Sequence, residues 1–490
     1  MSFELETAAN PQGLRRVAID PVSRVEGHGK VTLLLDDNNK IHQVRLHIVE
    51  FRGFEKFIQG RPYWEVPVMV QRLCGICPVS HHLAASKALD MIVGAKKLPP
   101  TAEKNRRLMH FGQMLQSHAL HFFHLCSPDL LFGFDSEVAK RNIVGVAQAN
   151  PDIARRGVLL RKFGQEVIRM TAGKRVHGTG SIPGGVNKSL TPEERAALLK
   201  DIYQMIAWSR DAVHLVKSLF EQNLAFYNEF GRFRANTLSL IRGDGAMDLY
   251  HGGLRARDAD GKTIFDQVDY SRYWEYLLEE VKPWSYMKFP FIRALGPDDG
   301  WYRVGPLARV NNCDFIPSPL ADKERQDFKA YDNGSAAGAT LGYHWARMIE
   351  MLHAAEGIKD LLHDDDIVGD ELFTQGEREE RGVGMIEAPR GTLIHHYRVD
   401  EHDQVVRANL IVSTTHNNQA MNEAIRQVAK RYLDGRTLTE GLLNHIEVAI
   451  RCFDPCLSCA THALGNMPLE LELVDADGGV VDRLSRLGGY

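Results

Sequence analysis

Apolar positions recur at helical spacing over much of the chain, and the pattern is strong enough in six stretches to predict helices. The fourth stretch has the best start signal, because Thr191 can cap a helix that begins with Pro192 and two acidic residues. Residues 16–50 instead form two β-rich runs joined by a polar turn at 36–39. The six predicted helices cover residues 66–92, 101–126, 152–171, 191–231, 335–363 and 419–434.

Two less regular zones, 177–187 and 295–334, interrupt the helices, and residues 467–484 alternate apolar and acidic positions as in a β-hairpin. We therefore expect a predominantly helical α+β fold with a long-helix core and small peripheral β regions. Three parts are predicted: an N-terminal arm and β region over 1–63, a helical core over 64–462 and a C-terminal extension over 463–490.

The composition narrows the classes of function. With 490 residues, 44% hydrophobic and 25% charged, the chain has the proportions of an ordinary globular protein. Its formal net charge of −4 gives no basic footprint for nucleic acid. No run of 18 apolar residues predicts a membrane span, and the first residues lack the apolar core of a secretory signal. We expect a cytoplasmic protein.

Four of the seven cysteines form two CxxC pairs near opposite ends of the chain, Cys74 with Cys77 and Cys456 with Cys459. Residues three apart face the same way on a helix or tight turn, so each pair can offer two sulfurs to one ion. Four thiolates suit zinc, Cu(I), an iron–sulfur cluster or a nickel–iron centre. The 378 residues between the pairs far exceed the spacing of a zinc ribbon, which favours a shared buried metal site over structural zinc.

The chain resembles the large subunits of [NiFe]-hydrogenases in both cysteine motifs, RLCGICPVSHHLAAS at 72–86 and DPCLSCATH at 454–462. Five further family motifs occur in the same order: RVEGH at 24–28, RGFE at 52–55, PGGV at 183–186, EAPRG at 387–391 and NLIVSTTHN at 409–417. The sequence around the first motif, and TTHN in place of TTWN, are most similar to those of the soluble NAD-reducing type.

The resemblance implies reversible, heterolytic cleavage of H₂ at a nickel–iron site whose iron carries CO and cyanide. Cys77 and Cys459 would bridge the two metals, and the proton would pass to Cys459 and then to Glu26. Arg390 would project over the open metal face, held by Asp454. The expected nickel ligands are Cys74, Cys77, Cys456 and Cys459. The residues expected around the diatomic ligands and behind the metal ligands are Pro389, Ser413, Thr414 and His81.

The resemblance also implies a second, structural metal. Glu55, His462 and the backbone carbonyl of Leu410 would bind Mg²⁺, which prefers oxygen ligands. In this family an endopeptidase removes the tail after the final histidine once nickel-insertion factors have loaded the site. Cleavage here would follow His462 and release residues 463–490.

The other three cysteines, Cys126, Cys313 and Cys452, cannot supply a four-cysteine cluster, and no P-loop or dinucleotide fingerprint is present. We expect a small iron–sulfur subunit to take the electrons and a diaphorase module, carrying FMN and NAD, beyond it. The histidines at 118, 121 and 124 are expected to pack in the core.

Three alternatives remain open at this level. The first is an H₂ sensor of the same fold that turns over slowly. The second is the related quinone-oxidoreductase subunit, which lacks the four cysteines that are present here. The third is a zinc-stabilised structural or binding protein.

Overall fold

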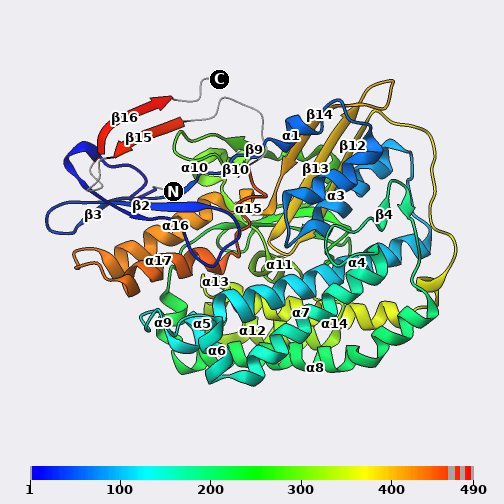
Figure 1. Cartoon of the computed structure of the whole chain (residues 1–490), viewed down its shortest axis with the longest axis horizontal. Coiled ribbons are helices and arrows are strands. Elements are labelled where there is room, and N and C mark those ends of the chain that lie inside the picture. The colour runs from blue at the N-terminus through cyan, green and yellow to red at the C-terminus, as the bar shows by residue number, and fades with distance from the viewer. Residues whose placement is uncertain (1–2, 462–468, 475–479, 487–490) are drawn as a thin grey trace.

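The computed structural model describes residues 3–461, 469–474 and 480–486. Figure 1 shows long helices gathered on one side of the molecule and several small sheets on the other. The helices are α1 (Phe54–Phe57), α2 (Val66–Met69), α3 (Pro78–Ile92), α4 (Pro100–Leu120), α5 (Ser127–Phe132), α6 (Ile143–Ala149), α7 (Pro151–Ala172), α8 (Pro192–Gln222), α9 (Leu224–Glu229), α10 (Gly296–Asp299), α11 (Pro306–Asn312), α12 (Pro319–Ala330), α13 (Ser335–Gly338), α14 (Gly342–His363), α15 (Ser413–His416), α16 (Asn418–Val428) and α17 (Glu440–Cys452).

The strands pair into small sheets, which are mostly antiparallel. Their orders are β1-β2-β3, β4-β5, β11-β6-β7-β8, β9-β10, β12-β13-β14 and β15-β16. The strands are β1 (Arg15–Ile19), β2 (Gly29–Leu35), β3 (Ile41–Ile48), β4 (Ser181–Ile182), β5 (Gly185–Val186), β6 (Asn236–Ile241), β7 (Gly253–Arg257), β8 (Thr263–Val268), β9 (Leu277–Glu280), β10 (Phe289–Ile292), β11 (Tyr302–Arg303), β12 (Arg381–Ala388), β13 (Gly391–Val399), β14 (Val405–Ile411), β15 (Leu469–Val474) and β16 (Val480–Arg486).

The core is a layer of long helices, as the sequence pattern predicts. Helix α4 packs against α7 and α14, and α14 also packs against α8. Helix α8 begins with a capping box in which Thr191 and Glu194 satisfy each other's backbone N–H groups. Helix α14 is buried along most of its length, including the large side chain of Trp345. The helical α+β fold class is therefore confirmed.

The predicted helix over 66–92 is wrong in its middle. Helix α2 passes into a 3-10 turn that ends at Leu73, and Cys74 then takes an extended conformation. Helix α3 starts only at Pro78, which is suited to a first helical position because it has no N–H to leave unpaired. The break frees the CxxC segment from the helix.

The zone at 295–334 is more regular than expected, since α11 and α12 lie within it. Each begins with a proline in its first turn, so the residues that suggested a loop mark helix starts instead. Helix α17 and the strands at 381–411 also went unpredicted. In β12 every residue after Arg381 is buried, which removes the alternation that identifies a half-exposed strand.

Both predicted hairpins form. Strands β2 and β3 pair antiparallel around the turn at 36–39, and β3 is fixed to α16 because the Leu46 N–H donates to Asn422 Oδ1 at 2.9 Å. The N-terminal β region therefore shares a core with helices near the other end of the chain. Strands β15 and β16 also pair antiparallel, while their connection at 475–479 lies outside the described residues.

The sheet β12-β13-β14 lies directly on α3. Glycine makes this approach possible, because a Cβ added at Gly382 would lie 1.9 Å from the Ala88 carbonyl oxygen. At Gly384 it would lie 2.1 Å from the Ala84 oxygen. Helix α3 follows the first cysteine pair, so this packing sets the position of that pair. Within the described segments, no helix combines the length and apolar character needed to cross a membrane.

We expect Gly384→Ala to lower the melting temperature by about 1–3 °C, because the added methyl group must push β12 away from α3. Scanning calorimetry of the purified chain measures this. Gly243→Ala is the matched control, since a Cβ there meets no atom within 4 Å. Equal melting temperatures for the two variants would contradict the close packing of β12 on α3.

Candidate metal centre

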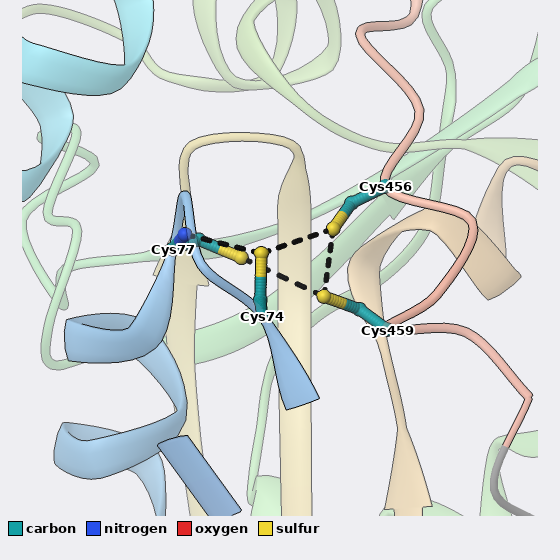
Figure 2. Close-up of side chains that lie close together, drawn as sticks. All are labelled: Cys74, Cys77, Cys456 and Cys459. Atoms are coloured by element: carbon teal, nitrogen blue, oxygen red, sulfur yellow. Dashed lines mark hydrogen bonds between the residues drawn. The ribbon is translucent and has the colours of Figure 1, made fainter. Parts of the chain in front are cut away.

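Four sulfur atoms from the two ends of the chain meet in the interior (Figure 2). Cys74 and Cys456 Sγ are 3.3 Å apart, Cys77 and Cys459 Sγ 3.8 Å, and Cys456 and Cys459 Sγ 2.7 Å. None of the four residues is more than 5% exposed. The structure thus brings together all four cysteines of the predicted site.

Local bonds shape the first cysteine turn. The sulfur of Cys74 accepts the N–H groups of Ile76 and Cys77, each at 3.2 Å, so the chain curls around it. From helix α4, Gln113 and Gln116 both donate to the Ile76 carbonyl, at 3.0 and 2.7 Å. The turn is therefore fixed by contacts from another element.

The approach to this turn is held as well. Arg52 of the RGFE motif donates to the carbonyl of Leu73 at 3.1 Å. The ring of His177 contacts the Cys74 carbonyl at 3.1 Å. Sequence reasoning missed His177, because it lies in a loop far from both cysteine motifs.

The second cysteine pair follows α17 in an irregular segment. Asp454 has a φ of +52°, which turns the chain sharply into the motif. The Cys456 N–H donates to Thr414 Oγ1 at 2.9 Å, and the Leu457 N–H donates to the Glu26 carbonyl at 2.9 Å. The C-terminal motif is thus held by the N-terminal RVEGH motif.

Burial makes four thiols in one place electrostatically demanding. Hydrogen bonds from Cys456, Cys459 and Cys74 lower the pKa of Cys77 well below its ordinary value. Burial raises the pKa of Cys456 and Cys459 well above theirs. Four thiolates can coexist here only with a cation to compensate their charge, so the donor set fits a thiophilic metal.

Arg390 is held beside the sulfurs. Its Nε donates to the Asp454 carbonyl at 2.6 Å and its Nη2 to Asp454 Oδ1 at 3.2 Å. Burial opposes the charged form, yet the Asp454 carboxylate and the sulfurs raise the pKa of Arg390 well above its ordinary value. Its Nη1 is buried and has no hydrogen-bond partner among the described residues. A donor is therefore left over at the metal site.

A small cavity adjoins the sulfurs and has a volume of about 240 Å³, including the part open to solvent. Thr414 Oγ1 accepts the Cys456 N–H, which leaves its own hydrogen for another acceptor. Ser413 differs, because its hydroxyl donates to the Gly391 carbonyl at 2.7 Å. His81 Nδ1 lies 3.1 Å from His395 Nε2. The residues of the sequence prediction that line the cavity are Cys77, His81, Pro389, Arg390, Ser413, Thr414, Cys456 and Cys459.

The carboxylate of Glu26 contacts the sulfur of Cys456 at 2.9 Å. From the sequence we expect the proton to reach Glu26 from Cys459, and that step stays a prediction; the sulfur in contact with Glu26 is that of Cys456. The reason is the backbone pairing of Glu26 with Cys456, which sets the two residues side by side.

A polar chain continues from Glu26 toward the surface, and sequence reasoning missed it. Ser458 donates its N–H to Glu26 Oε2 at 3.2 Å and its hydroxyl to Glu50 Oε2 at 2.9 Å. Glu50 Oε1 lies 2.5 Å from Nδ1 of His28, whose side chain is 67% exposed. Partial burial acts to raise the pKa of Glu50, but hydrogen bonds from His28 and Ser458 outweigh it and lower that pKa. His28 belongs to the RVEGH motif together with Glu26, and this was the feature of the sequence that could have indicated its role.

The predicted magnesium ligands are partly described. Glu55 is 4% exposed, and its Oε1 accepts the Leu410 N–H at 2.7 Å. The Thr461 carbonyl accepts N–H bonds from Arg52 and Gly53, so the described C-terminal segment reaches the RGFE motif. His462 lies outside the described residues.

A second group of possible ligands, His121, Cys126 and His344, is buried, and His121 Nε2 lies 3.9 Å from Asp454 Oδ1. His121 Nε2 donates to the Arg451 carbonyl at 2.7 Å, and its ring stacks on His344. On the preceding turn, His118 contacts Glu350 at 2.9 Å. His118 and His121 are therefore engaged in core contacts, as the sequence analysis expected.

Comparison with known proteins identifies the class. A family model described as nickel-dependent hydrogenase matches residues 52–138 and 212–462, and a model described as HoxL-like matches residues 16–51. The chain belongs to the nickel-dependent hydrogenase family.

Individual relatives cover nearly the whole chain. The "NAD-reducing hydrogenase HoxS subunit beta" of Cupriavidus necator is 48% identical, over 96% of this chain and 100% of its own length. One subunit of the F420-non-reducing hydrogenase of Methanothermobacter thermautotrophicus is 41% identical, with the same coverage. A crystal structure of an NAD⁺-reducing [NiFe]-hydrogenase in the H₂-reduced state matches with a TM-score of 0.91 and 59% identity, over 91% of this chain and 99% of that one.

We expect the metal-free chain to bind Co²⁺ with intense thiolate-to-cobalt absorption, because four sulfurs surround one position. Cys459→Ser should weaken that absorption and lower the affinity at least about tenfold. Cys313→Ala is the control, since Cys313 is buried away from the cluster. Identical titrations for the two variants would show that Cys459 is not a ligand.

Proposed function

We propose that the chain is the catalytic subunit of a hydrogenase that interconverts H₂ with protons and electrons at a Ni–Fe(CN)₂(CO) centre and passes the electrons toward NAD⁺. One observation carries the proposal: a buried four-sulfur cluster has, beside it, an arginine with an unpartnered donor. The donor set fits the group, because thiolates are strong ligands for nickel and iron and the spare donor suits an anionic ligand on the metal. When bound, that centre supplies the heterolytic cleavage of H₂.

The residues of the chain then handle the proton. We propose Glu26 as its acceptor, and the contact between its carboxylate and the sulfur of Cys456 supports this role. Ser458 links Glu26 to the next carboxylate, because it donates its backbone N–H to Glu26 and its hydroxyl to Glu50, and Glu50 in turn contacts the exposed ring of His28. A carboxylate in this position can accept a proton and give it back, so it serves both directions of the reaction. Cys459 remains a proposed first acceptor of the proton, and its sulfur lies 2.7 Å from that of Cys456.

The small cavity would hold the diatomic ligands. Arg390 Nη1 and the hydroxyl of Thr414 each have a hydrogen available for a cyanide. Ser413 already donates to Gly391, so its hydrogen is available only if that bond is exchanged. Pro389 and His81 complete the wall. Asp454 orients the guanidinium.

The remaining assignments follow the family resemblance of the sequence motifs. Glu55, His462 and the Leu410 carbonyl would hold a structural Mg²⁺. The electrons would leave through a small iron–sulfur subunit to a diaphorase that reduces NAD⁺. The name of the relative in Cupriavidus necator, a subunit of an NAD-reducing hydrogenase, supports NAD⁺ as the acceptor. We place this reaction in the cytoplasm. Nickel insertion would precede endopeptidase cleavage after His462, which removes residues 463–490.

Infrared spectroscopy of the complex purified with its native partners tests the function. We expect CO and cyanide bands that shift under H₂, together with NAD⁺ reduction by H₂. Band shifts with little turnover would indicate an H₂ sensor. Absent bands in a chain whose mass still includes residues 463–490 would mean an unmatured precursor. Absent bands in the processed chain would overturn the proposal in favour of a zinc site.

Glu26→Gln should reduce H₂ turnover by about 10²–10⁴-fold while nickel and iron content stay unchanged, because the amide cannot carry the proton. Metal analysis and H₂-dependent dye reduction measure the two quantities. The control is Glu193→Gln, an equivalent change at an exposed position on α8. Full turnover in Glu26→Gln would refute the relay.

A further inference from the structure

A second cavity lies beside β11, and its lining is strongly basic. It encloses about 1250 Å³, including the part open to solvent. Among its lining residues, Asp258 is the single acid, and its Oδ1 is already bonded to the backbone N–H groups of Asp260 and Lys262. The cationic lining residues are Arg232, Arg234, Arg257, Arg303 and Lys329.

Arg303 is the central feature of this cavity. It is 5% exposed, yet its Nε and Nη1 have no hydrogen-bond partner among the residues that the structure describes. Its Nη2 donates to the Phe233 carbonyl at a long 3.4 Å, and its guanidinium lies 4.9 Å from the Phe233 ring centre. In the part of the chain that the structure describes, no carboxylate forms an ion pair with it. Burial and repulsion from Arg232 lower the pKa of Arg303.

Two of the neighbouring cations, Arg232 and Lys329, also lack an ion-paired carboxylate among the described residues. Arg232 donates to two carbonyls, those of Asn228 and Ser335. Burial, Arg325 and Arg257 lower the pKa of Lys329. Two other arginines have acidic partners, Arg234 with Asp260 and Arg257 with Asp314. Three cations therefore face the cavity without an ion-paired carboxylate from residues 3–461 or the C-terminal hairpin strands.

A buried arginine with free donors is unfavourable unless something compensates it. We propose that this cavity binds a phosphate-type oxyanion, either free phosphate or the phosphoryl group of a small metabolite. The guanidinium of Arg303 would donate to two oxygens from one of its unpartnered nitrogens, Nε or Nη1, together with the second hydrogen of Nη2, because each of these pairs forms a planar fork of the kind arginine uses for phosphate. Arg232 and Lys329 would compensate the remaining charge. The site is separate from the metal centre and does not depend on the proposed hydrogenase activity.

Titration calorimetry of the native complex, with inorganic phosphate and with ADP as probes at constant ionic strength, tests the proposal. We expect saturable binding of at least one probe, and tighter binding of ADP would identify a nucleotide-type ligand. Arg303→Met should weaken binding at least about tenfold, because two charge-assisted hydrogen bonds are lost. Arg234→Gln, at the ion-paired rim, should change it less than about threefold.

Thermal stability gives an independent readout. Without phosphate, Arg303→Met should melt at or above the wild-type temperature, because an uncompensated buried charge is removed. Phosphate should raise the melting temperature of the wild type and not of the variant. Arg232→Gln serves as a second variant if Arg303→Met does not fold, and it should also weaken binding. No saturable binding by the wild type, equal losses in Arg303→Met and Arg234→Gln, or a carboxylate of a partner protein seated on Arg303 in the complex would overturn the proposal.

Discussion

The burial of four ionisable sulfurs at one point is the constraint on which the rest of the structure depends. All four cysteines are free thiols, so each pair must be positioned by its surroundings rather than by a bond to the other. Gln113 and Gln116 fix the first turn through the Ile76 carbonyl, and the Glu26 backbone fixes the second. Such support from rigid elements keeps ligands in place before any metal arrives, which is what a preorganised site requires.

Much of this arrangement could be predicted from the sequence, for two different reasons. The long helices are identifiable by their periodicity, and α8 also by its capping box. The site was predictable because its residues occur in short motifs, in which neighbours along the chain are also neighbours in the folded structure. The CxxC turns carry their own geometry, as the sulfur of Cys74 shows by accepting two N–H groups from its own loop.

The parts that escaped prediction lack such local signals. Strand β12 is buried on both faces, so no alternation marks it. The series from Glu26 through Ser458 to Glu50 joins residues that are hundreds of positions apart. The choice of Cys456 over Cys459 as the neighbour of Glu26 depends on a backbone bridge that only the fold creates. Contacts between distant segments follow from topology rather than from motif.

Several of the buried arginines are neutralised by carboxylates. Arg106 is paired with Asp90, and Arg309 with Glu350 and Glu387. Arg309 also donates to the carbonyls of Ala388 and Pro389, so it stiffens the turn that presents Arg390. Arg390 and Arg303 differ, because each keeps a buried donor without a partner in the described structure. In both cases the spare donor belongs to a residue that lines a cavity.

The distance between the cysteine pairs along the chain has a consequence for the loaded protein. An ion that bonds sulfurs from both pairs closes a ring, since Cys74 and Cys456 are 382 positions apart. By the chain-entropy relation for cross-links, a ring of this size stabilises the folded state by about 6 kcal/mol. A single protease nick between the pairs would then leave both fragments tied together through the metal. Release of the fragments would require loss of the ion as well as the cut.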